Sequence, residues 1–505
     1  MNRFARLILP LSGALLLAAC SASPAERLEQ ARQEIVRQNY AAARAELGAA
    51  LKEEPGNRAM LLLLAQTHLR LGDGAAAQGV IDRLKVQGAP DMGVMEAEAH
   101  LLRGQSASAL ELLGANATSD GWRVRAAAQL MLGEEAQALA AFRQGLAQGG
   151  DARLAGDFAR FLLATGDIAG AAAQLARVQR ERPEAIETLM LAGAVAEKQG
   201  RTDAALRLYQ AAAEKFPWLA APLVAQANAL DLLGRLDEAA KLTEAAAKVQ
   251  PGDPAVLDLQ LSVYSQQGQW DKIRKILQSQ EQTLSPTSAA GLTYAEALLR
   301  LDHPEQARAL FSKAVIVEPG NRYARMMLGE AQLATGDARA ALATLRPLTE
   351  GVFANPRELE LAAKAATAAG DPLGAQLTAR LQSAEFKRQG QLVGQGLAAT
   401  AQGNWRAALQ AWQGLQAYGE DAELLRRIAY SASVTGNHPL AVSSADKALA
   451  LRPGDGELLN LAGVVRLAQG RDLAAAVALL DAAFKADPDN AQFRADLAKA
   501  KAATG

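Results

Sequence analysis

The stretch Gln199-Gly200-Arg201-Thr202-Asp203-Ala204-Ala205 stands between two alanine-rich runs with helical spacing, and it decides the fold. Gly200 marks a tight turn, Ala205 follows it by five residues, and Tyr209 and Pro217 follow at fixed offsets. A fixed period in this size range indicates stacked helix pairs rather than one globular core. The pattern recurs 34 residues away in both directions, as Gly234, Ala239 and Pro251 downstream and as Gly166, Ala171 and Pro183 upstream.

The turn position continues through nearly the whole chain. From Gly166 to Gly470 its intervals are 33 or 34 residues, whereas the units that turn at Gly104 and Gly133 are compressed. We therefore predict an all-α, right-handed solenoid of about fourteen helix pairs over residues 26–488, irregular at about 90–150, with a capping helix over 489–505. The regular turn positions are Gly166, Gly200, Gly234, Gly268, Asp302, Gly336, Gly370, Gly403, Gly436 and Gly470.

The spacing follows from the physics of a helix pair. Two helices of about thirteen residues and two short turns make one unit, and neither helix buries its apolar stripe unless neighbouring pairs stack. Glycine at the turn supplies a positive φ. The alanine five residues later lets the two helices approach closely. Ile273 replaces this alanine in the unit around Trp270, which predicts different packing there.

Two polar stretches have the composition of linkers but do not interrupt the period. They are Gln278–Ser288 and Ala384–Gly396, and the turn positions on either side of each keep their phase. Because an inserted linker would shift the phase, we predict one continuous solenoid. A bend is expected only at the shortened units between Gly72 and Gly133.

The N-terminus has the pattern of a secretion signal. Met1–Ala19 carries early arginines and an apolar core, Leu7–Leu17, that is too short to span a membrane. The segment ends on the only cysteine, in Leu17-Ala18-Ala19-Cys20. This motif resembles the bacterial lipobox, in which the cysteine is lipidated and becomes the first residue of the mature protein. We therefore predict a signal peptide over 1–19, lipidation at Cys20 and a lipidated tether over 20–25, with an ordinary signal peptide as the alternative.

The repeat itself resembles the tetratricopeptide repeat. The resemblance covers nearly all of the chain after the signal and is strongest from Gly166 onward. It implies an α-solenoid in which the first helix of each unit lines a groove that binds segments of protein partners. The unit that matches the family pattern position by position contains Gly193, Gly200, Ala205, Tyr209, Ala212 and Pro217.

The groove positions of that family, mapped onto this chain, predict the partner-binding residues. Arg153 and Arg160 are seven residues apart on one helix face. With Arg123 one repeat earlier, they predict a basic strip suited to a carboxylate or phosphate. Asn228 occupies a position at which family members often hold a peptide backbone. For each residue, the alternative is a solvated side chain without a partner. The other predicted partner-binding residues are Asp231, Tyr323, Glu330, Arg426 and Tyr430.

The composition excludes several kinds of function. The net charge is −1, with both signs spread along the chain, so no basic segment suggests nucleic acid. Cys20 is the only cysteine, so the chain forms no internal disulfide and no cysteine-based metal cluster. The sequence has no hydrolase, phosphate-loop or zinc-protease motif. We therefore predict no enzymatic activity, no cofactor and no metal site.

The histidines leave one alternative open. His303 and His438 fall in turns, where solvated side chains are expected. His68 and His100 occupy the same position of consecutive repeats, where the resembling family usually has an aromatic residue. Packing in place of a tyrosine is the favoured interpretation, and a metal-binding pair is the alternative.

These features predict a non-catalytic scaffold, lipid-anchored to the bacterial outer membrane and facing the periplasm, that binds envelope proteins in its groove. By the lipobox resemblance, Ser21 favours transfer to the outer membrane. The architecture resembles the repeat lipoproteins of PEP-CTERM/exosortase-linked exopolysaccharide export. The alternatives are a lipoprotein of pilus or outer-membrane-protein assembly, and direct binding of a glycan or peptidoglycan fragment in the groove.

Overall fold

The computed structural model describes residues 22–89, 92–488 and 490–504. Within these ranges the chain forms 29 α-helices and two short 3-10 helices, and no strand occurs in them. The predicted all-α class is confirmed. The predicted signal peptide, the Leu17-Ala18-Ala19-Cys20 motif and Cys20 itself lie outside the described residues. In the described part of the chain, no helix combines the length and the apolar character that crossing a bilayer requires.

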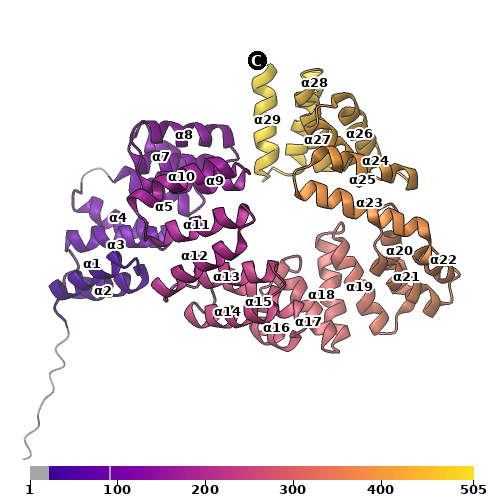
Figure 1. Ribbon diagram of the computed structural model, residues 1–505, viewed down its shortest axis with the longest axis horizontal. Helices are drawn as coiled ribbons and strands as arrows, with labels where there is room; N and C mark the ends of the chain where they lie inside the picture. The colour runs from indigo at the N-terminus through magenta and orange to yellow at the C-terminus, as the bar shows by residue number, and fades with distance from the viewer. Residues whose placement is uncertain (1–21, 90–91, 489, 505) are drawn as a thin grey trace, which may run out of the picture. The chain divides into compact units, whose positions relative to one another are not determined.

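The helices follow one another in antiparallel pairs, and Figure 1 labels them in chain order. The first fourteen are α1 (Pro24–Val36), α2 (Tyr40–Glu53), α3 (Arg58–Arg70), α4 (Gly74–Val86), α5 (Gly93–Leu102), α6 (Ser106–Leu113), α7 (Ser119–Met131), α8 (Glu135–Ala147), α9 (Ala152–Ala164), α10 (Ile168–Glu181), α11 (Ile186–Lys198), α12 (Thr202–Lys215), α13 (Ala221–Leu232) and α14 (Leu236–Val249). The others are α15 (Pro254–Gln266), α16 (Trp270–Leu277), η1 (Gln278–Gln280), α17 (Ala289–Arg300), α18 (Pro304–Val317), α19 (Arg322–Ala334), α20 (Ala338–Thr349), α21 (Pro356–Ala369), α22 (Leu373–Gln382), α23 (Ala384–Ala401), α24 (Trp405–Leu415), η2 (Gln416–Tyr418), α25 (Ala422–Val434), α26 (His438–Leu451), α27 (Gly456–Gln469), α28 (Leu473–Ala486) and α29 (Ala491–Thr504).

Helices α1 to α28 make the fourteen predicted pairs, and α29 is the additional C-terminal helix. We call the odd-numbered first helix of each pair the A-helix and the even-numbered second one the B-helix. Contacts group the pairs into two compact units. The first unit contains the described residues up to Met131, together with Ala136–Leu162 and Ala173–Thr188. The second unit contains Leu132–Glu135, Leu163–Ala172 and the described residues from Leu189 onward.

The turns between A- and B-helices have the backbone conformation that the sequence predicts. Gly200 has a φ of 73°, and the other glycines of the series also have positive φ values. At two turns without glycine, Asp302 and Gln38 adopt φ values of 62° and 60°. All fourteen turn positions are therefore left-handed, including the two where an L side chain must tolerate it.

The residue after the turn often caps the B-helix. Asp73 follows Gly72, and its carboxylate accepts a hydrogen bond from the Ala76 amide at 2.9 Å. Asp337, Asn404 and Asn437 make the same kind of contact at the starts of α20, α24 and α26. Such a cap satisfies a backbone donor that the helix leaves unpaired. The left-handed turn residue ends the A-helix and the capping residue begins the B-helix, so together they fix the connection between the two helices.

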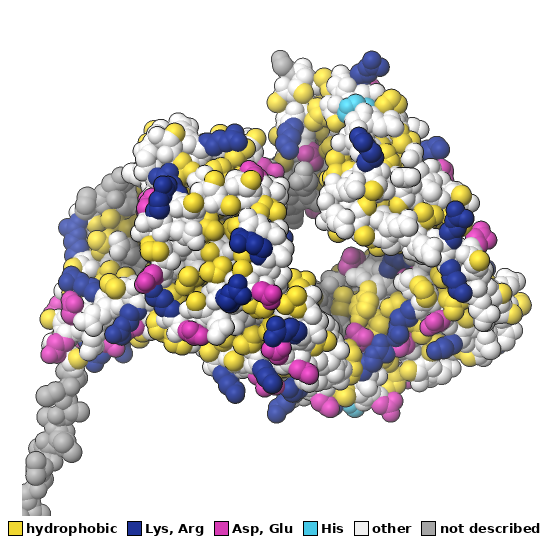
Figure 2. All heavy atoms as spheres, in the orientation of Figure 1, with side chains coloured by type: hydrophobic (Ala, Val, Ile, Leu, Met, Phe, Trp, Pro, Cys, Tyr) yellow, Lys and Arg dark blue, Asp and Glu magenta, His cyan; other side chains and the backbone are white. Residues whose placement is uncertain are grey.

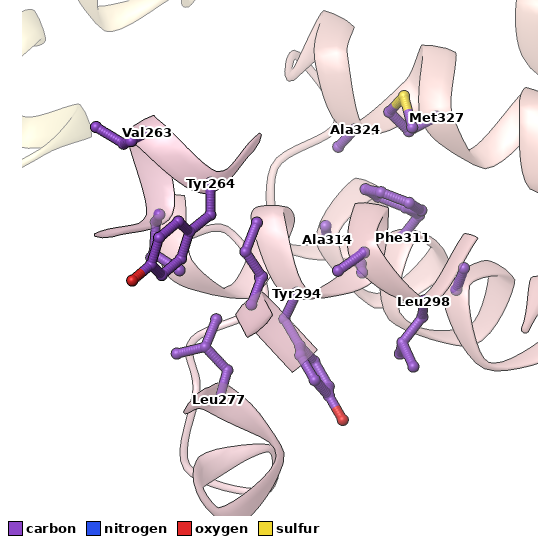
Figure 3. Close-up of a cluster of buried hydrophobic side chains, with 14 of the residues drawn as sticks. Val263, Tyr264, Leu277, Tyr294, Leu298, Phe311, Ala314, Ala324 and Met327 are labelled. Atoms are coloured by element: carbon purple, nitrogen blue, oxygen red, sulfur yellow. The ribbon is translucent and has the colours of Figure 1, made fainter. Parts of the chain in front are cut away.

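Helix pairs pack through small residues that face large ones. The ring of Tyr209 lies where a Cβ on Gly193 would stand, and Leu345 and Trp412 are placed in the same way against Gly329 and Gly396. Between pairs, buried side chains form continuous clusters. Figure 3 shows one in which A- and B-helices contribute alternately, and its labelled members include Tyr264, Leu277, Tyr294, Leu298, Phe311, Ala324 and Met327.

The irregular units differ in the length of their B-helices. α6 has eight residues and α16 also has eight, whereas α4 and α12 have 13 and 14. α16 contains Ile273, which is fully buried, and the 3-10 helix η1 follows it directly. Ala384–Gly396, which has the composition of a linker, is part of the 18-residue helix α23. The structure thus places this stretch inside a helix of the series, whereas Gln278–Ser288, the other stretch of linker composition, contains η1 and connects α16 to α17.

One contact in the first unit joins residues far apart in the sequence. The Gln38 side chain is buried at the α1–α2 turn. Its amide oxygen accepts a hydrogen bond from the Ile186 backbone at 3.0 Å, and its amide nitrogen donates to Glu187 at 2.9 Å. Gln38 therefore holds the start of α11 against the first helix pair of the chain.

Two alanine substitutions separate the role of the turn glycine from the general effect of removing a glycine. Gly200→Ala places a Cβ at positive φ, and we expect it to destabilise the protein by about 1–2 kcal/mol. Gly390→Ala, inside α23 where an added Cβ meets nothing within 4 Å, should instead stabilise it by up to about 1 kcal/mol. Chemical denaturation followed by circular dichroism measures both. Equal effects of the two substitutions would contradict the turn assignment.

Candidate functional site

The A-helices of the first unit line a common cavity of about 290 Å³. α1 contributes Ile35, α2 contributes Tyr40, and α3, α5, α7 and α9 contribute the other lining residues. Five successive A-helices reach the same space, and we call this face the groove; that it binds a partner, as the repeat pattern predicts, stays a prediction. The polar lining residues are Tyr40, Gln66, Thr67, Arg70, Glu98, Asp120 and Arg153.

Two of the predicted arginines meet carboxylates in this groove. Arg123 approaches Glu98 at 2.6 Å and Asp120 at 3.1 Å. Arg153 approaches the same Asp120 at 2.8 Å and Glu98 at 3.9 Å. Each carboxylate therefore bridges two guanidinium groups that come from neighbouring A-helices.

The network extends to the third predicted arginine. Asp157 lies 3.9 Å from Arg123 and also pairs with Arg160. The sequence analysis correctly brought the three arginines together, but it predicted a basic strip. The structure corrects that charge: Glu98, Asp120 and Asp157 alternate with the arginines, so the strip is a mixed-charge network.

Burial and the neighbouring charges act in opposite directions on the two central arginines. Burial would lower the pKa of Arg123, but Glu98, Asp157 and Asp120 raise it above its ordinary value. Burial lowers the pKa of Arg153, and the positive charges of Arg123 and Arg70 lower it further. Both side chains stay charged at neutral pH because an arginine starts from so high a pKa. Their charges are largely matched within the network.

Arg70 is the cation that the sequence analysis missed. It is exposed at the end of α3, lines the cavity, and has no hydrogen-bond or ion-pair partner among the described residues. Arg70 follows the same groove spacing as the predicted residues, so the spacing rule would have included it. The sequence does not show that Arg70 lacks an ion-pair partner whereas Arg123 and Arg153 have one.

The second unit carries a comparable network on its A-helices. Glu330 of α19 accepts hydrogen bonds from Arg300 of α17 at 2.7 Å and from Arg357 of α21 at 2.8 Å. Glu296 of α17 accepts from Arg300 at 3.0 Å and from the hydroxyl of Tyr323. Burial would raise the pKa of Glu330, but Arg300 and Arg357 lower it below its ordinary value. Burial, together with Glu296, raises the pKa of the Tyr323 hydroxyl.

The predicted residues Tyr323 and Glu330 thus lie in one network, whereas the others lie apart from it. Asn228 is exposed on α13. Asp231, on the same helix, accepts a hydrogen bond from Gln266 at 3.2 Å. Arg426 pairs with Glu423 at 2.7 Å within α25. Whether these residues bind a partner stays a prediction.

Tyr430 of α25 is the predicted residue with the most exposed aromatic surface. About half of it is exposed, and its ring meets the ring of Trp405 edge-on at a centroid distance of 5.1 Å. Leu397 of α23 and Val434 of α25 are also exposed. These A-helices near the C-terminus therefore present exposed apolar side chains in addition to the ion pair of Arg426 with Glu423.

The histidines do not form a metal site with other ligands in the described part of the chain, where no group of three or more histidine, cysteine, aspartate or glutamate side chains is placed to hold an ion. His68 lies 3.7 Å from Asp73. Burial lowers the pKa of His68, which favours the neutral ring. The Nδ1 atoms of His68 and His100 are both buried. This is the environment of a packing residue.

The charge pattern of the surface is mixed as well. Figure 2 shows lysine and arginine side chains interspersed with aspartate and glutamate over the visible face. Fourteen helix pairs, with polar networks between A-helices in each unit and a cavity lined by the A-helices of the first unit, define an α-helical repeat protein of the scaffold type. The chain belongs to the tetratricopeptide repeat family. One model of that family matches residues 37–91, 196–262 and 298–365, and a second matches 157–220 and 393–456. Together they cover more than half of the chain, and neither describes a catalytic family.

Comparison with solved structures returns other helical assemblies at low similarity. The crystal structure of the APC/C hetero-tetramer Cut9-Hcn1 is 15% identical, with a TM-score of 0.36, and the match covers 94% of this chain and 96% of that one. The structure of Naa15/Naa10 bound to HypK-THB is 15% identical, with a TM-score of 0.27, over 95% of this chain and 66% of that one. Among curated protein sequences, no match was found.

Removing a central arginine tests the first-unit network. Arg123→Met leaves the half-buried Glu98 without its closest cation, and we expect a loss of about 2 kcal/mol of stability. Arg160→Met is the control, because Arg160 is half exposed and pairs only within its own helix. It should cost about 0.5 kcal/mol or less. Urea denaturation compares the two variants, and equal losses would show that the network adds nothing.

Proposed function

We propose that this protein is a non-catalytic scaffold whose A-helix faces bind segments of protein partners in the bacterial envelope. The observation that carries the proposal is Arg70, an unpaired cation in a cavity whose other charges are matched. In the first-unit network, Glu98 and Asp120 hold Arg153 in a fixed position before a partner arrives. An acidic or polar segment that meets such a preorganised surface loses little free energy to side-chain ordering.

A groove of mixed charge favours selective binding of particular partner segments over nonspecific binding of any acidic chain. A groove with only arginines would attract any acidic chain, whereas alternating charges repel segments whose charges are out of register. The second-unit network of Glu296, Arg300, Glu330 and Arg357 has the same alternation. Tyr430 and its exposed apolar neighbours offer a different chemistry on the same series of helices. A scaffold of this kind would bind different partner segments at different repeats.

Charge reversal of Arg70 tests this proposal. Because Arg70 is exposed and has no partner in the described chain, Arg70→Glu should leave the fold intact. After chemical crosslinking and affinity purification from membranes, we expect recovery of at least one envelope protein to fall about tenfold, which corresponds to about 1.4 kcal/mol. Arg143→Glu is the matched control, because Arg143 is exposed on the B-helix α8. The proposal fails if the same proteins are recovered in equal amounts from both variants.

The proposed location is the periplasmic face of the outer membrane, through a lipid on Cys20. The sequence Leu17-Ala18-Ala19-Cys20 supports this, as does the absence of any other cysteine in the chain. Several acyl chains bury many methylene groups, at about 0.8 kcal/mol each, so the anchor would be stable.

Metabolic labelling tests the anchor directly. Radioactive palmitate should label the wild-type protein and should not label Cys20→Ala. Membrane fractionation of the same cells should move the variant from the outer-membrane fraction to the soluble fraction. Equal labelling of the two proteins would remove the lipoprotein assignment and leave the scaffold proposal standing.

The cellular system that we propose is export of an exopolysaccharide with PEP-CTERM/exosortase-linked sorting. A lipobox followed directly by many alanine-rich repeats is the architecture that supports it. Pilus assembly and outer-membrane-protein assembly use the same design and remain alternatives. The proteins recovered through Arg70 would discriminate among them, because each system has a different set of components.

A further inference from the structure

A second cavity lies away from the A-helix groove, at the shortened repeat of the first unit. It measures about 570 Å³ and is bounded by the loop after α6 and by helices α7 and α8. α6 has eight residues whereas α4 has 13, so this B-helix ends early and leaves space beside α8. The compression that the sequence shows near Gly104 and Gly133 thus produces an open surface depression, most of whose lining residues are exposed.

The rim of this cavity is held in place by hydrogen bonds. The Arg125 guanidinium donates to the carbonyl of Gly114 at 2.7 Å and to that of Asn116 at 3.1 Å. The Asn116 side chain accepts from the backbone and the hydroxyl of Thr118, at 3.0 and 2.6 Å. These hydrogen bonds fix the conformation of the loop, and two of them come from the Arg125 guanidinium.

Amide side chains dominate the polar lining. Gln137 and Gln144 belong to α8, Gln148 follows its last residue, and Gln129 belongs to α7. Gln148 accepts a hydrogen bond from the indole of Trp122 at 3.0 Å. The side chains of Gln137 and Gln144 have no hydrogen-bond partner among the described residues, and the amide oxygen of Gln129 is buried without one.

The rest of the lining is apolar and small. Ala115, Ala117, Ala140 and Ala141 supply methyl groups, and the lining contains no carboxylate and no lysine. The Arg125 guanidinium lies 4.6 Å from the ring centroid of Trp122, and the Cβ and Cγ of Trp122 lie against Gly145. The described lining therefore consists of neutral amides and methyl groups, together with Trp122 and the charged Arg125.

We propose that this cavity, which we call the glutamine pocket, binds a neutral saccharide. A sugar ring alternates C–H and O–H groups, so its C–H face suits the alanine methyls and its hydroxyls suit the amides. Each glutamine amide both donates and accepts, which matches the pair of neighbouring hydroxyls on a pyranose. The Arg125 guanidinium donates to two backbone carbonyls at the rim, and its remaining N–H groups can donate to a sugar hydroxyl. Helix α7 lines both sites, but the glutamine pocket and the Arg70 groove share no lining residue, so we expect the two to bind independently.

Calorimetric titration of the purified full chain tests the proposal, with N,N′,N″-triacetylchitotriose and maltotriose as the two probes. We expect saturable binding of at least one of them with one site per chain. Gln137→Leu combined with Gln144→Leu should weaken that binding about tenfold, because two amide contacts are lost. Ala140→Phe, which fills the exposed floor of the pocket, should abolish it.

The controls separate this site from a general loss of fold and from the groove. Gln30→Leu changes an exposed glutamine on α1, and Arg70→Glu changes the groove, so both should bind the saccharide as the wild type does. The proposal is overturned if neither oligosaccharide binds saturably, or if the pocket variants and Gln30→Leu bind equally. Saturable binding of an uncharged alanine tetrapeptide in place of both sugars would also overturn it, since the pocket would then recognise peptide.

Discussion

Gly193 leaves room for the ring of Tyr209, and that close approach of an A-helix to its B-helix is the contact on which the architecture depends. Gly329 with Leu345 and Gly396 with Trp412 repeat it. A small residue on one helix sets the distance between axes, and the large residue fills the space that would otherwise be a void. The positive-φ turn before the B-helix then fixes the angle at which the large residue arrives. Once both are set, each pair presents its remaining apolar stripe to the next pair.

The polar groups of the A-helices are organised by the same repetition. Residues at equivalent positions of successive repeats come from parallel helices, so a carboxylate on one helix can bridge arginines on its neighbours. The networks around Glu98 and Glu330 arise in this way. Such networks contribute modestly to stability because they remain partly solvated. Their effect is to fix the directions of long side chains that would otherwise move independently.

The fold could be predicted from the sequence because its signals are local and periodic. Turn glycines recur with the repeat and an alanine follows most of them at a fixed distance, so fourteen pairs and a capping helix followed from counting. The charge of the groove did not follow in the same way. Repeat spacing places Arg123, Arg153 and Arg160 on one face, but pairing with Glu98 and Asp157 depends on how side chains cross between helices.

The glutamine pocket could not be predicted for a related reason. The sequence shows that residues are missing near Gly104, but not which helix ends early. The missing residues shorten α6 to eight residues, and the space beside α8 results from this shortening. A deletion is visible in a sequence as a phase error, whereas the void that it creates is a property of the neighbouring helices. The conformation of the irregular repeats could therefore be learned only from the structure, whereas that of the regular repeats could be predicted from the sequence.

The hydrogen bonds of Gln38 to Ile186 and Glu187 change the mechanics of the first unit. In a linear array each repeat touches only its neighbours, so unravelling can start at a free end and proceed one repeat at a time. Here the α1–α2 turn is tied to a helix 148 residues further along. Unfolding of the first repeat therefore also breaks the contacts that hold the start of α11. The N-terminal repeat is then no longer the part of the array that unfolds most easily. For a chain pulled by a tether at its N-terminus, the load would be shared across the first unit before any single repeat opened.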